Sequence, residues 1–258
     1  MKQFIPLIAL ILTTSCTQSQ TISEPIQVKT IETDSLTAVE KHFLSFNNLK
    51  GTSRSTGTVS DGALENGYLL PFSGANYHYF DTNSYLHNRC FMHLKVKETL
   101  LATYAQLETT VPKRLFGIME CSNEHGGKIA PHRTHQNGLS VDFMTPLRQN
   151  GIPYTELDFM GAAHYLMDFD ENGCYTEDST VQIDFELMAF HLLTLIEQTK
   201  NQGLSIEKII WNTELRDELF ATESGKKLKA TGVYVTTNLS PLINSLHDDH
   251  YHVDFKLK

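Results

Sequence analysis

Several features that define other classes of protein are missing from this sequence of 258 residues. The 21 Lys and Arg are outnumbered by 30 Asp and Glu, and the formal charge of −9 argues against a protein that binds nucleic acid through its phosphates. No stretch approaches the roughly 20 apolar residues that a membrane-spanning helix needs. The absence of internal repeats excludes a solenoid. With 40% hydrophobic and 20% charged residues, the sequence predicts an acidic globular protein.

Residues 1–16, MKQFIPLIALILTTSC, have the layout of a secretory signal. Lys2 supplies the positive charge, residues 4–12 are apolar, and small residues lead to Cys16. A cysteine directly after small residues resembles a bacterial lipobox, in which the thiol is lipidated and becomes the mature N-terminus. We therefore expect a signal peptide over 1–15, a lipid-anchored tether over 16–50 and a folded domain over 51–258. A plain signal peptide cut nearby is the alternative.

Three cysteines remain after Cys16, namely Cys90, Cys121 and Cys174. An exported protein sits where disulfides persist, and an odd number leaves at least one thiol unpaired. The sequence leaves open which pair forms, if any. No CxxC pair is present, which disfavours a zinc site built from thiolates.

Helices and strands are predicted to mix without a regular βαβ rhythm, so the expected fold class is α+β. Residues 51–76 are rich in Gly, Ser and Asn and predict loops and turns. In residues 250–258, Tyr251, Val253 and Phe255 are expected on one strand face and His250 and His252 on the other. Helices are predicted over 36–46, 96–107, 184–200 and 213–219, and strands over 114–119, 139–147, 208–212 and 250–258.

Histidine is concentrated in two short segments, PHRTHQNGLSVDF and HDDHYHVDF. With 12 histidines in the chain, a six-residue window should contain roughly 0.3 of one, whereas residues 247–252 contain three. The side chains in these segments that are candidates for metal binding or catalysis are His132, His135, Asp142, His247, His250 and His252.

The spacing within the two segments favours a metal site. His250 and His252 are two apart in a strand, so their rings share one face, roughly 6.5–7 Å apart, which suits one ligand and one neighbour that reaches a water. Gly138 permits a sharp turn after His135, before the strand that carries Asp142. Two imidazoles and a carboxylate suit Zn²⁺ and leave a fourth position open. The helical HExxH zinc motif does not occur.

Hydrogen-bonded structural roles are expected for the other histidines. His125, in the turn-like run NEHGG, is expected to be a loop residue. The remaining members of this set are His42, His78, His87, His93, His164 and His191.

The pattern His135-x6-Asp142 followed by His250-x-His252 is similar to the metal signature of the lysostaphin, D-Ala-D-Ala peptidase and hedgehog superfamily. Within it, GGKIAPHRTHQNGLSVDF resembles the GG…H-x-S-H-Q-x-G-L-D-V-D run of penicillin-insensitive murein endopeptidases, and HDDHYH matches their H-x-x-H-x-H. The resemblance covers about residues 50–258. Ser140 stands where the family usually has Asp, which removes no ligand.

The resemblance implies an α+β fold with a small, mainly antiparallel central sheet, flanking helices and a zinc site on the sheet. One zinc ion would be bound by His135, Asp142 and His252, and a second site has no support. His250 would be the general base or would orient the attacking water. A protonated His132 or His247 would line the site and stabilise developing charge.

The implied function is a zinc-dependent murein endopeptidase that cleaves D-Ala-containing peptide cross-links of peptidoglycan in the periplasm. A D-Ala-D-Ala carboxypeptidase or dipeptidase shares the metal residues and is one alternative. A zinc-stabilised module that binds wall peptides without cutting them is another, although the presence of both His250 and His252 favours the enzyme. A cysteine peptidase using Cys90 or Cys121 lacks a recognisable Cys-His signature.

The predicted anchor can be tested at Cys16. Thr17, rather than Asp, follows this cysteine, which favours sorting to the outer membrane of a Gram-negative cell. The substitution Cys16→Ser should move the protein from the membrane fraction to the soluble fraction, because the lipid is the only predicted attachment. Fractionation followed by immunoblotting measures this. A processed Cys16→Ser protein that stays on membranes contradicts the prediction.

Overall fold

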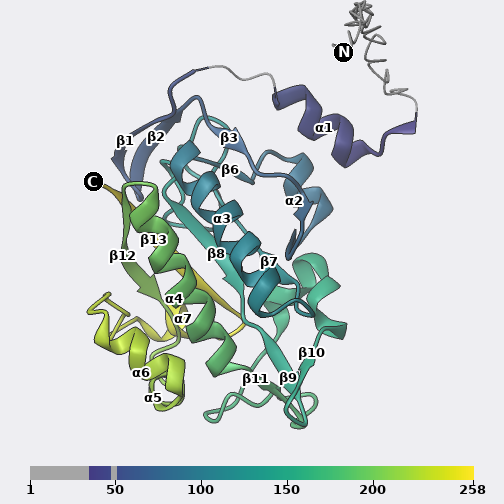
Figure 1. Ribbon diagram of the computed structural model, residues 1–258, viewed down its shortest axis with the longest axis vertical. Helices are drawn as coiled ribbons and strands as arrows, with labels where there is room; N and C mark the ends of the chain where they lie inside the picture. The colour runs from purple at the N-terminus through teal and green to yellow at the C-terminus, as the bar shows by residue number, and fades with distance from the viewer. Residues whose placement is uncertain (1–34, 48–50) are drawn as a thin grey trace, which may run out of the picture. The chain divides into compact units, whose positions relative to one another are not determined.

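A six-stranded mixed sheet lies at the centre of the part of the chain that the structure describes (Figure 1). The computed structural model describes residues 35–47 and 51–258. All neighbouring strands are antiparallel except β5 and β7, so the predicted α+β class is confirmed. In order across the sheet the strands are β12 (Leu204–Ile210), β13 (His250–Leu257), β8 (Ser140–Met144), β7 (Phe116–Ile118), β5 (Tyr77–Tyr79) and β4 (Ser73–Gly74).

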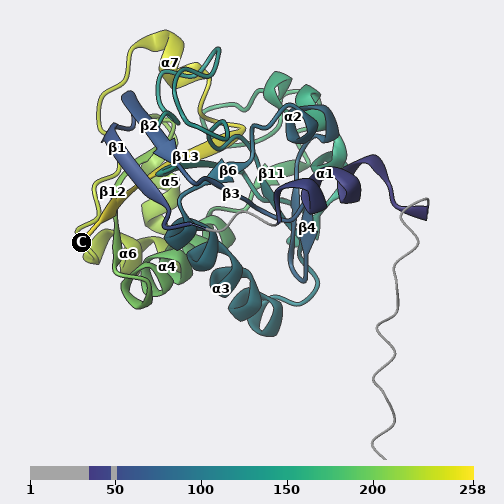
Figure 2. The ribbon, with the colours of Figure 1, turned by 90° about the horizontal axis from the view of Figure 1, so that it is seen from above.

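Two long helices, α3 (Leu94–Thr110) and α4 (Phe185–Asn201), pack together on one side of this sheet (Figure 2). The His93 side chain caps α3 by accepting a hydrogen bond from the Lys95 N–H, and Asp184 caps α4 in the same way. Apolar residues at a spacing of three and four form the buried stripe of each helix. Both helices confirm the predictions for 96–107 and 184–200.

The two faces of strand β13 have different surroundings. One faces the hydrophobic core, and the other lies on the opposite side of the sheet. Tyr251, Val253 and Phe255 are at most 1% exposed and belong to the hydrophobic core. The Tyr251 hydroxyl lies 2.8 Å from Nδ1 of His191 on α4, so this face of β13 points toward the two long helices. Because side chains alternate along a strand, His250 and His252 point to the other side, as predicted.

The prediction of loops over residues 51–76 is wrong in part. A hairpin forms there from β1 (Arg54–Thr58) and β2 (Asp61–Glu65), closed by a turn in which the Thr58 hydroxyl accepts from the Asp61 N–H. Only one residue of this hairpin, Leu64, is buried. Exposed polar strands lack the alternation of apolar residues on which the prediction depends, so the pattern could not reveal them.

The folded unit extends from Leu36 to Lys258 and therefore includes α1 (Ala38–Phe46). Phe46 of this helix contacts Phe91 with ring centroids 5.0 Å apart, so part of the segment expected as tether packs on the domain. The predicted signal peptide, Cys16 and the tether up to residue 34 lie outside the described residues.

The remaining described elements are short. The predicted helix over 213–219 begins later than expected, at Arg216. The helices are α2 (Thr82–Leu86), η2 (Glu156–Phe159), η3 (Gly161–Leu166), α5 (Arg216–Ala221), α6 (Glu223–Ala230) and α7 (Pro241–Ser245). The strands are β3 (Tyr68–Leu69), β6 (Phe91–Met92), β9 (Leu147–Gln149), β10 (Ile152–Tyr154) and β11 (Val181–Ile183).

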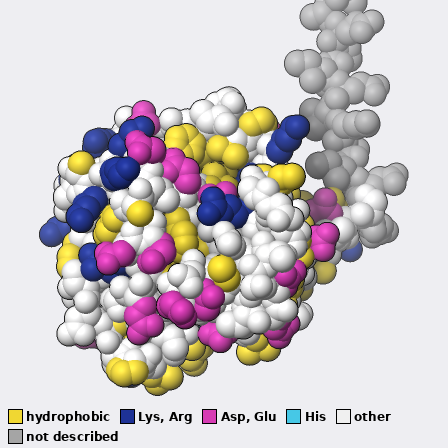
Figure 3. Space-filling view, turned by 90° about the horizontal axis from the view of Figure 1, so that it is seen from below, with side chains coloured by type: hydrophobic (Ala, Val, Ile, Leu, Met, Phe, Trp, Pro, Cys, Tyr) yellow, Lys and Arg dark blue, Asp and Glu magenta, His cyan; other side chains and the backbone are white. Residues whose placement is uncertain are grey.

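Surface and cysteine chemistry agree with an ordinary globular domain. On the face drawn in Figure 3, acidic and basic side chains are interspersed with apolar ones. Within the described residues, no helix has the length and apolar character needed to cross a bilayer. Cys90, Cys121 and Cys174 are all free thiols, and the first two are buried. A buried thiol is poorly placed to act as a nucleophile.

Candidate functional site

Antiparallel pairing of β8 and β13 creates a cluster of histidines and carboxylates. Asp142 on β8 lies directly opposite His252 on β13, and His252 Nδ1 is 2.7 Å from Asp142 Oδ1. His135, in the loop before β8, places its Nε2 3.1 Å from the same Nδ1 and 3.2 Å from Asp142 Oδ2. The structure thus brings together the three side chains that the sequence predicts as metal ligands.

The loop before β8 reverses direction through two residues in the left-handed region. His135 has a φ of 67°, which is uncommon for a residue with a side chain, and Gly138 has a φ of 76°. A Cβ at Gly138 would lie only 2.8 Å from the backbone nitrogen of His93 and from Leu64. Glycine is therefore required here, and the sharp turn expected after His135 is present.

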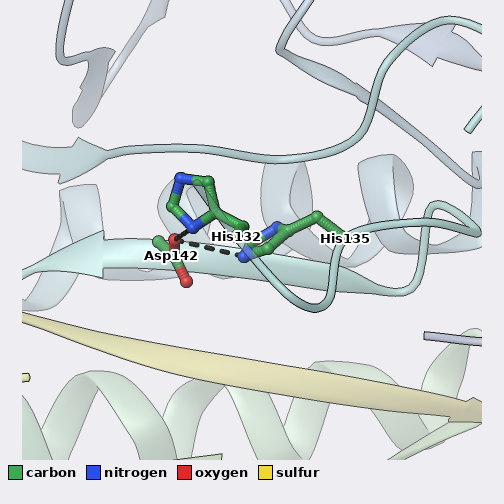
Figure 4. A group of neighbouring side chains, drawn as sticks. All are labelled: His132, His135 and Asp142. Atoms are coloured by element: carbon green, nitrogen blue, oxygen red, sulfur yellow. Dashed lines mark ion pairs between the residues drawn. The ribbon is translucent and has the colours of Figure 1, made fainter. Parts of the chain in front are cut away.

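His132 completes a group with metal-binding geometry (Figure 4). One ligand atom from each of His132, His135 and Asp142 lies within 4.8 Å of the others. Asp142 Oδ2 is 3.7 Å from His132 Nδ1, and the dashed lines in Figure 4 show it between the two imidazoles. This group could hold a metal ion.

The hydrogen bonding of the cluster also fits a bound cation. Asp142 Oδ2 is buried and makes no hydrogen bond, although nitrogens of His135 and His132 lie 3.2 Å and 3.7 Å from it. Burial would raise the pKa of Asp142, but the nearby His135 and His252 outweigh it and hold that pKa well below its usual range. An ionised, buried oxygen without a donor is costly unless a cation satisfies it, and two imidazoles beside a carboxylate suit a transition metal.

His252 also contacts a carboxylate that the sequence did not single out, that of Asp254 on β13. Its Nε2 lies 2.6 Å from Asp254 Oδ1, which also accepts a hydrogen bond from the Ser140 hydroxyl at 2.6 Å. Lys208 Nζ is 3.0 Å from the other oxygen of Asp254. Burial would lower the pKa of His252, but Asp254 and Asp142 outweigh it and raise it to about 10. Because Asp254 contacts Nε2 of His252, the other ring nitrogen, Nδ1, faces Asp142 and His135.

His250 has a comparable arrangement. Its Nδ1 contacts the carboxylate of Asp249, which leaves Nε2 as the free ring nitrogen. Burial opposes protonation of His250, but Asp249 overrides this and raises the pKa of the ring. A carboxylate that orients an imidazole through one nitrogen is the usual partner of a general base.

The two remaining predicted residues differ from expectation in their charge. Burial lowers the pKa of His132 to about 3 and that of His247 to about 4. Both rings are therefore neutral near pH 7, in contrast to the protonated donor expected from the sequence. His247 lies beside His250, with ring centroids 4.9 Å apart, and its Nδ1 is 2.7 Å from the Ile243 carbonyl oxygen.

Three residues near the cluster escaped sequence reasoning. Asp249 directly precedes β13 and Asp254 belongs to it, and the importance of both shows only through their contacts with His250 and His252. Tyr165 belongs to η3, and its ring centroid lies 5.3 Å from that of His250. Its surrounding run, GAAHYL, carries no recognisable motif, so no signal in the sequence could have identified it.

Several other histidines have the structural roles expected of them. The ring of His191 lies between Tyr104 and Tyr251 in the core, with a nitrogen near each hydroxyl. His93 caps α3, and His87 contacts the Asn83 carbonyl oxygen. His125 is a loop residue with its side chain 83% exposed.

Comparison with known families agrees with this site. The family model described as penicillin-insensitive murein endopeptidase matches residues 55–257, a range that contains both histidine segments. No curated protein matches the chain. A murein endopeptidase is a hydrolase of peptidoglycan, the polymer of the bacterial cell envelope. The match confirms the resemblance found in the two motifs, and the chain belongs to the penicillin-insensitive murein endopeptidase family.

Proposed function

We propose that this protein is a zinc-dependent endopeptidase that hydrolyses D-Ala-containing peptide cross-links of peptidoglycan. The observation that carries the proposal is that His135 Nε2 and His252 Nδ1 converge on the buried carboxylate of Asp142, one oxygen of which, Oδ2, makes no hydrogen bond. Membership of a murein endopeptidase family supports the substrate class.

We assign the metal to His135, Asp142 and His252. His252 is favoured because a carboxylate behind the imidazole, here Asp254, is the usual support of a metal-ligating histidine. His132 is more exposed than these three residues, with 16% of its side chain accessible, and we assign it to the lining of the site. A single zinc ion is proposed for this set of ligands.

Zinc held in this way would lower the pKa of a coordinated water and polarise the scissile carbonyl. His250 would accept the proton of the attacking water and return it to the leaving amine nitrogen. Asp249 would stabilise the imidazolium between these two transfers. His247 packs against His250 and restricts its ring.

The location follows from the substrate and from the N-terminal residues. Peptidoglycan lies in the cell envelope, and the lipobox-like segment ending at Cys16 supports attachment through a lipid. We propose a periplasmic enzyme tethered to the outer membrane.

Digestion of purified peptidoglycan tests the function directly. The protein should convert cross-linked muropeptide dimers to monomers, a chelator should abolish this, and zinc should restore it. Mass spectrometry of the fragments identifies the bond. Release of terminal D-Ala alone would indicate a carboxypeptidase, and binding without cleavage would indicate a recognition module. Cleavage that the chelator does not affect would refute the proposed dependence on a metal ion.

Substituting His250 and His252 one at a time distinguishes the proposed general base from the proposed metal ligand. His250→Ala should keep its metal while turnover falls by about 10²–10⁴, the usual size of a lost general acid–base contribution. His252→Ala should lose both metal and activity, because only two protein ligands remain. Metal content and cross-link cleavage are measured for each variant. Unchanged cleavage by His250→Ala would contradict the assigned base.

Asp254 provides a test of how His252 is oriented. Asp254→Ala should weaken metal binding by about 10–100-fold, because the imidazole loses the group that fixes its tautomer and direction. Lys208→Ala is the matched control: it removes the ion pair between the half-exposed Lys208 and Asp254 but leaves the contact with His252, and should change affinity only a few-fold. Competition with a metal indicator measures both. Equal affinities in the two variants would contradict the role of Asp254.

A further inference from the structure

Tyr165 lies over the histidine cluster from a third segment of the chain. Its ring centroid is 5.3 Å from that of His250 at an interplanar angle of 86°, and 6.5 Å from that of His132. On another side it packs against Phe80, with centroids 5.7 Å apart. The side chain therefore sits between the proposed base and the histidine that lines the site.

The hydroxyl of Tyr165 is buried and has no hydrogen-bond partner. Other buried tyrosines in the described residues have theirs: the Tyr85 hydroxyl donates to the Leu70 carbonyl at 2.7 Å, and that of Tyr251 lies 2.8 Å from His191. Leaving a buried hydroxyl unpaired costs about 1–3 kcal/mol. A buried, unpaired donor next to a candidate active site is available to an acceptor that binds there.

The position of Tyr165 is fixed by neighbouring contacts. The preceding residue, His164, is buried and places its Nε2 2.9 Å from the carbonyl oxygen of Asp249, so η3 is attached to the start of β13. Burial raises the pKa of Tyr165 well above its usual range, with the Asp142 carboxylate adding to the effect. The phenol therefore retains its proton and remains a donor under all physiological conditions.

Peptide hydrolysis needs a donor of this kind. When a water oxygen attacks the carbonyl carbon, one C–O bond forms, the π electrons move to the carbonyl oxygen, and the water proton passes to His250. The negative oxygen is best stabilised by a preorganised donor. His247 is poorly suited, because its Nδ1–H is directed at the Ile243 carbonyl oxygen and the neutral ring then presents an unprotonated Nε2.

We propose that Tyr165 is a catalytic residue whose O–H donates a hydrogen bond to the carbonyl oxygen of the scissile peptide as that oxygen becomes negative. This inference rests on the proposed peptidase function. It explains why a tyrosine whose ring packs against the proposed base has a buried hydroxyl without a partner in the protein.

The test removes only the hydroxyl. Tyr165→Phe should lower kcat for cross-link cleavage by about 10²–10³, the usual effect of losing one oxyanion donor, with KM and metal content close to those of the parent. A phosphinate analogue that mimics the tetrahedral intermediate should bind more weakly by a similar factor, whereas an uncleaved substrate peptide should bind equally well. Tyr154→Phe, at a half-buried position on β10 where the hydroxyl contacts the exposed Glu156, is the control and should behave like the parent.

The outcomes distinguish this inference from the function on which it rests. A parent protein that cleaves no cross-links overturns both. Cleavage by the parent with an unchanged kcat in Tyr165→Phe overturns the role of Tyr165 alone. Equal loss of affinity for the phosphinate and for the substrate peptide, accompanied by a lower unfolding temperature, indicates a packing role and overturns the inference as well.

Discussion

The pairing of β8 with β13 is the interaction on which the rest of the site depends. It places Asp142 opposite His252, although the two residues are 110 positions apart in the chain. A slip of one residue in this register would turn His252 toward α4 and bring Tyr251 to the site, because strand side chains alternate. Burial of Tyr251, Val253 and Phe255 opposes such a slip. The hydrophobic face of β13 therefore positions the polar residues on its other face.

Burial of charge is the main cost of this arrangement, and each carboxylate offsets it in the same way. Asp142, Asp249 and Asp254 are each at most 3% exposed, and each contacts an imidazole. Pairing and hydrogen bonds are what make buried charges tolerable. Asp254 also accepts a hydrogen bond from Ser140, which lies opposite it on β8. The two carboxylates that contact His252 therefore come from both strands, Asp142 from β8 and Asp254 from β13.

The groups left unsatisfied are as informative as those that are paired. Asp142 Oδ2, His135 Nδ1 and the Tyr165 hydroxyl are buried without hydrogen bonds in the same region of the protein. Unpaired buried atoms occur elsewhere in the described residues too, such as Trp211 Nε1 and His78 Nε2. Those at the site differ in having a ligand to receive: a metal ion would satisfy Asp142 Oδ2, and a polar substrate would satisfy the Tyr165 hydroxyl.

The sequence alone determined the fold class, the two long helices, the alternation along β13 and the two histidine segments. These features are local: helical spacing, strand alternation and motif composition can be read within about twenty residues. Tertiary structure decided which side chains meet. The β1–β2 hairpin has no apolar alternation, and Asp249 and Tyr165 belong to no spacing rule. The alternation along β13 predicts that Asp254 shares a face with His252, but only the structure shows that the two side chains are in contact. Their roles arise only where β8, β13 and η3 come together, because a hydrogen bond or a ring contact depends on distance in space rather than on position along the chain.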